Sequence, residues 1–362
     1  MRFFLLSALI STSAICAAQS VASPPALPAA QAPVWTMEDS GTTASLRGID
    51  SVDGTVAWAS GSEGTVLRTT DGGAHWERCT TPDGDKDGAK LDFRGVQAWD
   101  AKTAIVMASG PGELSRLYKT TDGGQTWALL AKNNDKDGFW DAISVADQES
   151  IMILGDPVEG QFSVLDSNDG GKSWNRERDA GLRSLAKEGA FAASNSSLIV
   201  DWVDGYGAFG AGGPAGARIF FDHESSAKGE IWEASPIPSF PKGEGAGVFS
   251  LNYRDWRRWM AVGGDYTKPN ESAGTAAWSA DGGKHWTTST TTPHGYRSAV
   301  QWSEALRAWI AVGTNGSDQS RDDGKTWSAL DDGNWNALSL PFAVGPKGRI
   351  ARQNATAISG GK

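Results

Sequence analysis

The chain has 362 residues, with 33 lysines and arginines against 43 aspartates and glutamates, which gives a formal net charge of −10. This balance lacks the basic field of a nucleic-acid-binding protein, so no nucleic-acid partner is expected. With 45 glycines and 21% charged residues, the chain fits neither a coiled coil nor an acidic disordered protein. Its 17 tryptophans stand against 5 tyrosines and 5 methionines. Such a composition favours many short strands joined by tight turns.

Residues 1–22 are predicted to be a secretion signal, because a short basic start precedes an apolar run and then small residues. Ala18 or Ala22 is the expected last residue before cleavage. Lipidation at Cys16 is the weaker alternative, since Ile15 stands where that processing requires a small residue. No other stretch reaches roughly 18 apolar residues, so no transmembrane segment is predicted.

Residues 23–33 are rich in proline and alanine and are predicted to be a flexible lead-in. After signal cleavage the chain keeps one cysteine, Cys79. No intramolecular disulfide can then form, so stability has to come from packing. An exported protein without disulfides fits a bacterial periplasm better than an animal secretion. The expected location is therefore periplasmic or secreted.

One octapeptide pattern, Ser/Thr-x-Asp-x-Gly-x-x-Trp, occurs five times along the chain. Its aspartates are Asp71, Asp122, Asp169, Asp281 and Asp322, and its tryptophans are Trp76, Trp127, Trp174, Trp286 and Trp327. Successive copies lie 51, 47, 112 and 41 residues apart. The double interval indicates one unit that has lost the pattern, and a degenerate copy fits at residues 221–232.

The pattern predicts a β-hairpin. The aspartate accepts backbone N–H bonds and the glycine takes a positive φ, so together they make a tight turn. The serine or threonine ends the preceding strand, and the tryptophan begins the next strand and packs back over the turn. These residues are therefore interpreted as structural.

The five copies resemble the Asp-box, or bacterial neuraminidase repeat, of β-propellers, in which the box joins the third and fourth strands of a four-stranded blade. Three further segments, 155–160, 263–266 and 295–300, resemble a bacterial group described as photosystem II stability/assembly factor-like or sialidase-like proteins. The resemblance covers nearly the whole mature chain. It implies an exported, non-catalytic binding or scaffold propeller with a protein partner or an anionic or glycan ligand, acting as a monomer.

A second pattern gives the number of blades. Each unit opens with an apolar or aromatic residue followed by a variable one. The seven pairs are Leu46-Arg47, Phe93-Arg94, Trp140-Asp141, Phe191-Ala192, Phe249-Ser250, Tyr296-Arg297 and Trp335-Asn336. The last unit lacks a box, so the strand-like segment 34–38 is expected to complete it and close the ring. The prediction is an all-β, single seven-bladed propeller over residues 34–358, with six blades as the alternative.

The second residue of each pair supplies the candidate ligand-binding residues at the mouth of the channel. Three are arginines from neighbouring blades, Arg47, Arg94 and Arg297, with Asn336 among them and Asp141 on the third blade. Guanidinium groups suit carboxylate or phosphate, so this arc predicts an anion site. The alternative is that each arginine pairs with an acid of a neighbouring blade.

A glycoside hydrolase of sialidase-like or endoglucanase-like type is the alternative function, although a non-enzyme is favoured. Two carboxylates on either side of a glycosidic bond can hydrolyse it. Asp141, Asp156 and Asp265, with Tyr266, are the candidates for that chemistry. The Arg-Ile-Pro signature of sialidases is absent from the sequence.

No organic cofactor is expected, and calcium is the weak candidate for a metal. Asp83, Asp85 and Asp87 alternate along one loop before a glycine, as in the first half of a calcium loop. The glutamate that should complete such a loop is missing. Two long segments, 204–217 and 264–277, are predicted to be projecting loops that contact a partner.

Overall fold

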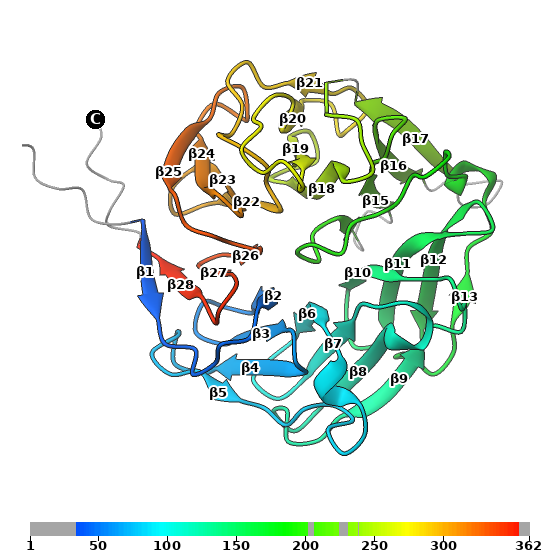
Figure 1. Ribbon diagram of the computed structural model, residues 1–362, viewed down its shortest axis with the longest axis vertical. Coiled ribbons are helices and arrows are strands. Elements are labelled where there is room, and N and C mark those ends of the chain that lie inside the picture. The colour runs from blue at the N-terminus through cyan, green and yellow to red at the C-terminus, as the bar shows by residue number, and fades with distance from the viewer. Residues whose placement is uncertain (1–33, 202–205, 224–230, 238, 355–362) are drawn as a thin grey trace, which may run out of the picture. The chain divides into compact units, whose positions relative to one another are not determined.

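The computed structural model describes residues 34–201, 206–223, 231–237 and 239–354. In this part of the chain, seven four-stranded antiparallel sheets surround a common centre (Figure 1). The predicted all-β, seven-bladed propeller is confirmed. The predicted signal, the lead-in and the last residues of the proposed domain, 355–358, lie outside the described residues.

Each sheet is one blade, and its strands follow one another outward from the centre. Blade 1 holds β2 (Leu46–Ser51), β3 (Ala57–Gly61), β4 (Thr65–Thr69) and β5 (Glu77–Arg78); blade 2 holds β6 (Phe93–Ala98), β7 (Ala104–Ala108), β8 (Arg116–Thr120) and β9 (Ala128–Lys132). Blade 3 holds β10 (Trp140–Val145), β11 (Ser150–Val158), β12 (Gln161–Asn168) and β13 (Asn175–Arg176); blade 4 holds β14 (Leu198–Asp201), β15 (Tyr206–Ala211), β16 (Ala217–His223) and β17 (Ile231–Ile237). Blade 5 holds β18 (Ala246–Tyr253), β19 (Trp259–Asp265), β20 (Ala276–Ser279) and β21 (Thr287–Thr288); blade 6 holds β22 (Ala299–Ser303), β23 (Ala308–Gly313), β24 (Gly316–Ser320) and β25 (Ser328–Asp331). Blade 7 holds β26 (Ala337–Ser339), β27 (Phe342–Val344), β28 (Ile350–Gln353) and β1 (Trp35–Glu38).

In the part of the chain that the structure describes, the helical segments are three short 3₁₀ turns: η1 (Gly88–Lys90), η2 (Gly112–Leu114) and η3 (Ala180–Leu182). Within the described residues, no helix is long and apolar enough to cross a membrane.

Strand β1 closes the ring. It pairs antiparallel with β28, with Trp35 opposite Gln353. Trp35 is buried, its ring centroid lies 5.4 Å from that of Trp335, and its Nε1 donates to Ser317 Oγ at 3.1 Å. The first strand of the propeller thus joins its last blade and contacts blade 6, which removes an open sheet edge.

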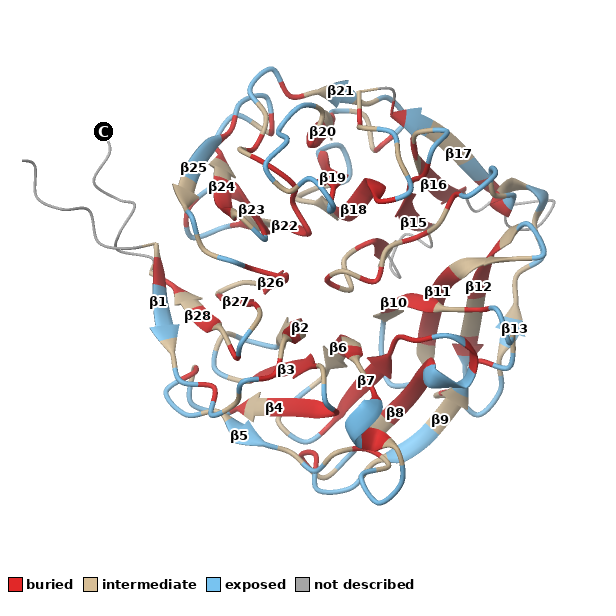
Figure 2. Ribbon diagram, viewed as in Figure 1, coloured by how far each residue is buried: buried red, intermediate tan, exposed pale blue. Residues whose placement is uncertain are grey.

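The core lies between the blades. Seven apolar clusters form within the described residues, one for each pair of neighbouring blades. Between blades 1 and 2, for example, Trp58 packs with Phe93 and Tyr118. Strands β3 and β7 are buried along their whole length because adjacent blades cover both faces, whereas the outermost strands β5 and β25 are largely exposed (Figure 2).

The octapeptides form the outer hairpins that the sequence predicted, between the third and fourth strands of five blades. In blade 1, Asp71 Oδ1 accepts from the backbone N–H of His75 at 2.9 Å, and Thr69 Oγ1 accepts from Gly73 N at 3.0 Å. Gly72 and Gly73 have φ of 76° and 91°, which other residues rarely adopt. Hydrogen bonds from the backbone N–H and the side chain of His75 hold the pKa of Asp71 at about 2, below its usual 3.8.

Blade 4 departs from the prediction. Its first strand is β14, which begins at Leu198 and not at the predicted pair Phe191-Ala192. Within the segment 204–217, the described residues are not one projecting loop, because Tyr206–Ala211 form β15 and Ala217 begins β16. The apolar alternation of a propeller strand is short, so a nearby aromatic in a loop can imitate a strand start.

Candidate functional site

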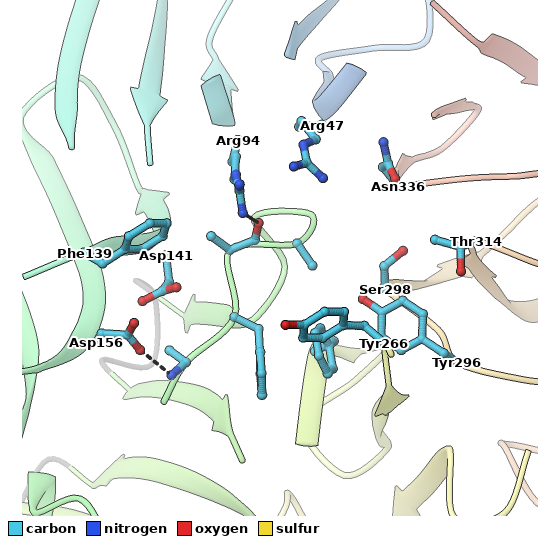
Figure 3. Close-up of a pocket in the computed structure, with 15 residues that line it drawn as sticks. Arg47, Arg94, Phe139, Asp141, Asp156, Tyr266, Tyr296, Ser298, Thr314 and Asn336 are labelled. Atoms are coloured by element: carbon cyan, nitrogen blue, oxygen red, sulfur yellow. Dashed lines mark hydrogen bonds between the residues drawn. The ribbon is translucent and has the colours of Figure 1, made fainter. Parts of the chain in front are cut away.

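A pocket with a volume of about 490 Å³ lies where the first strands of the blades begin and the second strands end. Blades 1, 2, 3, 5, 6 and 7 all contribute to its walls, as does the segment that precedes β14. This is the end of the propeller at which the sequence placed the candidate residues. Figure 3 shows the side chains pointing into the pocket from several directions.

Two arginines form the cationic side of the pocket. Arg47 follows the start of β2 and Arg94 follows the start of β6, so the same register brings them to neighbouring positions (Figure 3). Both contact one carboxylate oxygen of Asp92, Arg47 Nη2 at 3.3 Å and Arg94 Nε at 2.8 Å. One carboxylate therefore serves two guanidinium groups, which leaves one positive charge uncompensated within this trio.

Aromatic rings form the facing wall. Phe191 stacks on Phe249 with ring centroids 3.9 Å apart, and Phe249 meets Tyr296 edge-to-face at 4.8 Å. Tyr266 adds an exposed ring at 6.3 Å from Phe249. Burial raises the pKa of the Tyr296 hydroxyl above its usual range, so this group stays neutral. The pocket thus offers an apolar surface opposite its cationic side.

Residues 189–197, here named the crossing segment, precede β14 and reach from the side of blade 4 into the centre of the ring (Figure 1). Arg94 Nη1 donates to Ala192 O at 3.2 Å, and Ala190 N donates to Asp156 Oδ1 at 3.0 Å. Ser194 Oγ donates to Ser298 O at 2.6 Å. These bonds tie the segment to blades 2, 3 and 6, and its residues 190–193 line the pocket.

Two carboxylates face the pocket beside the crossing segment. Asp141 lies in β10 and is 2% exposed, and Asp156 lies in β11 (Figure 3). Burial raises the pKa of Asp141 well above its usual value, the neighbouring Asp156 raises it further, and Arg94 opposes the change. Burial also raises the pKa of Asp156 to about 6, while the hydrogen bond from Ala190 lowers it.

The predicted arc of three arginines is wrong at its third member. Arg297 is fully buried within blade 6, where its Nε donates to Asp318 Oδ2 at 2.6 Å and its Nη1 donates to Asn315 Oδ1 at 2.6 Å. The alternative that the sequence left open, pairing with an acid, therefore describes Arg297. In its place Tyr296 lines the pocket, because β22 begins only at Ala299.

Asn336 lies at the pocket as expected, but its Nδ2 donates to Leu46 O at 2.7 Å and so holds blade 7 to blade 1.

Of the residues considered for glycoside hydrolysis, Asp141, Asp156 and Tyr266 line the pocket. Asp265 does not. Its Oδ1 accepts from Thr267 N at 3.0 Å and from Thr267 Oγ1 at 2.7 Å, so it stabilises a turn.

The aspartates of the suggested calcium loop are bonded by side chains of blade 2. Arg116 donates to both oxygens of Asp87 at 2.7 Å, and Tyr118 Oη donates to Asp83 Oδ2 at 2.7 Å. A guanidinium thus occupies the position in which these carboxylates would hold a cation. Among the described residues, no group of three or more histidine, cysteine or acidic side chains could hold a metal ion. Asp85 lies exposed on the same loop.

Sequence reasoning missed the aromatic wall and the crossing segment. Phe249 and Tyr296 were noted as strand starts, and the residue after each was expected to face the channel. In β18 the register shift lies between Val248 and Ser250, so Phe249 itself takes the position that Arg47 and Arg94 hold in β2 and β6. Phe139 and Thr314 belong to loops and carry no periodic signal.

The comparisons with known proteins agree with this fold. No family model matches the sequence. The photosystem II assembly lipoprotein Ycf48 of Synechococcus sp. (strain CC9902) is 22% identical over 351 residues, which cover 92% of this chain and 92% of that relative. The solved structure of YCF48 bound to D1 peptide matches with a TM-score of 0.63 and 18% identity over 92% of this chain and 99% of that one. YCF48 from Cyanidioschyzon merolae matches with a TM-score of 0.65 and 16% identity over 89% of this chain and 99% of that one. The resemblance predicted from the sequence is thereby confirmed, and this chain is a seven-bladed β-propeller similar to the photosystem II assembly factor Ycf48 along nearly its whole length.

Proposed function

We propose that this chain is a non-catalytic assembly factor that binds a peptide segment of a protein partner in its central pocket. The peptide places a carboxylate at Arg47 and Arg94 and an apolar or aromatic side chain against Phe249 and Tyr266. The observation that carries the proposal is this pairing of two guanidinium groups with an aromatic wall in one pocket.

The cationic side suits a carboxylate better than a neutral group. Because Asp92 already accepts from both arginines, the guanidinium forks are held in place before a ligand arrives. A charge-assisted hydrogen bond contributes about 1.5–3 kcal/mol. Preorganisation reduces the entropy that binding has to overcome.

The aromatic wall suits a side chain of the same peptide. Tyr266 is 56% exposed although it is large and largely apolar, and covering it would remove apolar area from water. Aromatic residues beside arginines are typical of the energetically important parts of protein interfaces. The similarity to Ycf48, one structure of which holds a D1 peptide, supports a peptide as the ligand.

The glycoside hydrolase alternative has less support. It needs two carboxylates that reach both sides of a glycosidic bond. Asp141 is almost fully buried, and Asp265 serves a turn away from the pocket. The similarity to an assembly factor over nearly the whole chain also favours binding.

Export to the periplasm is part of the proposal. It is supported by the apolar run within residues 1–22 and by the name of the Synechococcus relative, a lipoprotein. Signal cleavage after Ala18 or Ala22 and attachment of lipid at Cys16 give mature chains of different mass. Mass spectrometry of the protein from its native host distinguishes them.

The binding site is tested with a hexapeptide library in which every position varies. One arm has both ends blocked, and a second arm has free carboxyl ends. The wild-type chain should enrich acidic residues in the first arm or free carboxyl ends in the second, together with an aromatic or large aliphatic residue. The double variant Arg47→Gln, Arg94→Gln should lose the preference for carboxylates by at least tenfold, which corresponds to about 1.4 kcal/mol.

The matched control removes two arginines elsewhere, with Arg78→Gln and Arg257→Gln on exposed positions of blades 1 and 5. It should keep the preference of the wild type, because the net charge falls equally but the pocket is intact. Equal losses in the two double variants would mean that only the overall charge matters, and the pocket would not be the site.

A further inference from the structure

We infer that Asp141 and Asp156 form a subsite for a cationic nitrogen, so that the bound peptide carries a lysine or arginine side chain in addition to its carboxylate. This inference rests on the proposed function and adds to it the second charge of the ligand. The peptide is thus bipolar, with its acidic group at the arginines and its basic group at the aspartates.

The first observation is a buried carboxylate with one unpartnered oxygen. Backbone N–H groups of Asp156 and Ala192 favour the ionised form of Asp141, so the missing partner concerns Oδ2 alone. Asp141 is 2% exposed and lines the pocket. Its Oδ2 is covered and accepts no hydrogen bond among the described residues. A buried carboxylate oxygen that lacks both water and a donor costs free energy, and a cation brought close by a ligand offsets that cost.

The second observation is a second carboxylate, Asp156, which is close enough to act on Asp141 and is more exposed. Asp156 is partly exposed and lines the central pocket as well as an adjoining cavity of about 510 Å³. Its Oδ1 accepts from Ala190 N at 3.0 Å, which fixes the carboxylate against the crossing segment. Asp156 can therefore contact a ligand directly, at a position close to Asp141.

The cation that acts on Asp141 and the cation that lines the adjoining cavity have other partners. Arg94 is the guanidinium that acts on Asp141, but its Nε donates to Asp92 and its Nη1 to Ala192 O. In the adjoining cavity Lys187 pairs with Glu244 at 2.5 Å. Throughout the described parts of the chain, no salt bridge reaches Asp141 or Asp156.

The charges of the whole pocket agree with a bipolar ligand. On one side, two guanidinium groups share Asp92 and leave one positive charge. On the other side lie two carboxylates; burial raises the pKa of both, and the neighbouring Asp156 raises that of Asp141 further. A peptide with one acidic and one basic side chain compensates both sides at once, whereas a purely acidic peptide leaves the aspartates unpaired.

Shape supports the same assignment. Figure 3 places Arg47 and Arg94 on one side of the pocket and Asp156 on another, with the crossing segment between them. Phe139 lies two residues before Asp141 in the chain and lines the pocket, and the guanidinium carbon of Arg94 lies 5.9 Å from the centroid of its ring. An aromatic face beside two carboxylates suits an alkyl chain that ends in a charged nitrogen.

The test uses the same hexapeptide library with the double variant Asp141→Asn, Asp156→Asn. The wild-type chain should enrich lysine or arginine at least fivefold at a fixed distance from the carboxylate or aromatic position. The variant should lose the enrichment of basic residues and keep that of carboxylates. The single variant Asp156→Asn is measured as well, because its amide oxygen can still accept the Ala190 N–H and so preserve the crossing segment.

The matched control is Glu63→Gln with Glu113→Gln, which removes two exposed acids of blades 1 and 2. It should keep both preferences. One selected peptide is then compared with its norleucine counterpart by calorimetry, and the wild type should bind the basic form about tenfold more tightly. The aspartate variants should bind the two forms equally.

The outcomes separate this inference from the proposed function. Enrichment of carboxylates without basic residues, or basic enrichment that survives in both aspartate variants, overturns the cation subsite and leaves the anion site standing. Basic enrichment that depends on the aspartates, but without any preference for carboxylates, supports the subsite and overturns the arginine site. A library with no enrichment overturns both.

Discussion

Replacement of Arg297 by methionine should destabilise the propeller far more than the same change at Arg47. The sequence pattern predicted equivalent positions for the two arginines, but the structure gives them different surroundings. Arg297 is fully buried and contacts Asp318, which is 1% exposed. Arg47 is 30% exposed and shares Asp92 with Arg94.

The expected magnitudes follow from burial. Arg297→Met leaves the Asp318 carboxylate buried with its main counter-charge removed, and also removes donors to Tyr296 O and Asn315 Oδ1, each at 2.6 Å. Removal of one partner of a buried pair costs about 3–5 kcal/mol. A partly exposed pair contributes about 0–1 kcal/mol, so Arg47→Met should cost no more than that.

Urea unfolding followed by tryptophan fluorescence measures both variants. The double variant Arg297→Met, Asp318→Asn should lose less than the sum of its single variants, because it leaves no unpaired charge. A loss below about 1 kcal/mol for Arg297→Met, or equal losses for Arg297→Met and Arg47→Met, would refute the assignment of Arg297 to a structural ion pair.

Three further predictions concern closure and pH. Trp35→Ala should lower the free energy of unfolding by about 3–5 kcal/mol, because Trp35 is buried against Trp335; a loss in urea unfolding below 1 kcal/mol would show that the first strand does not hold the ring. Hydrogen bonds lower the pKa of the box aspartates Asp71, Asp122, Asp169 and Asp281 to about 2, so the stability that these carboxylates contribute is complete above their usual pKa of 3.8 and is lost as pH falls towards 2. The variant Asp122→Asn should therefore show a smaller fall in melting temperature between pH 5 and pH 2 than the wild type. A fall equal to that of the wild type would contradict this. Burial raises the pKa of Asp141, so ionisation of this carboxyl destabilises the fold as pH rises above 3.8. The variant Asp141→Asn should therefore raise the melting temperature at pH 8 more than at pH 4. An equal change at both pH values would count against a buried ionised carboxylate.

The architecture could be predicted because its signals are local. Each box is a run of eight residues whose side chains bond to their own backbone, as Asp71 does with His75. A hairpin of this kind forms wherever the residues occur in order, and five of them at blade spacing define the repeat. The closure by residues 34–38 followed from a blade that lacked its fourth strand.

The site could be predicted only in part, because it depends on strand register. Arg47 and Arg94 lie in β2 and β6, which have the same register shift, and both line the pocket. Arg297 precedes its strand and turns into the blade. A shift of one residue moves a side chain to the opposite face, and the sequence does not specify such a shift.

By itself, then, the sequence determined the repeat, the outer hairpins and the closed ring of seven blades, since these arise from contacts between residues close in the chain or from the count of units. Only the tertiary structure decided which charges meet. Asp141 lies near Asp156 and Ala192, and Arg94 reaches Ala192 O from 98 residues away. Such contacts form when blades pack around a common centre, and there the crossing segment and the opposed charges of the pocket come together.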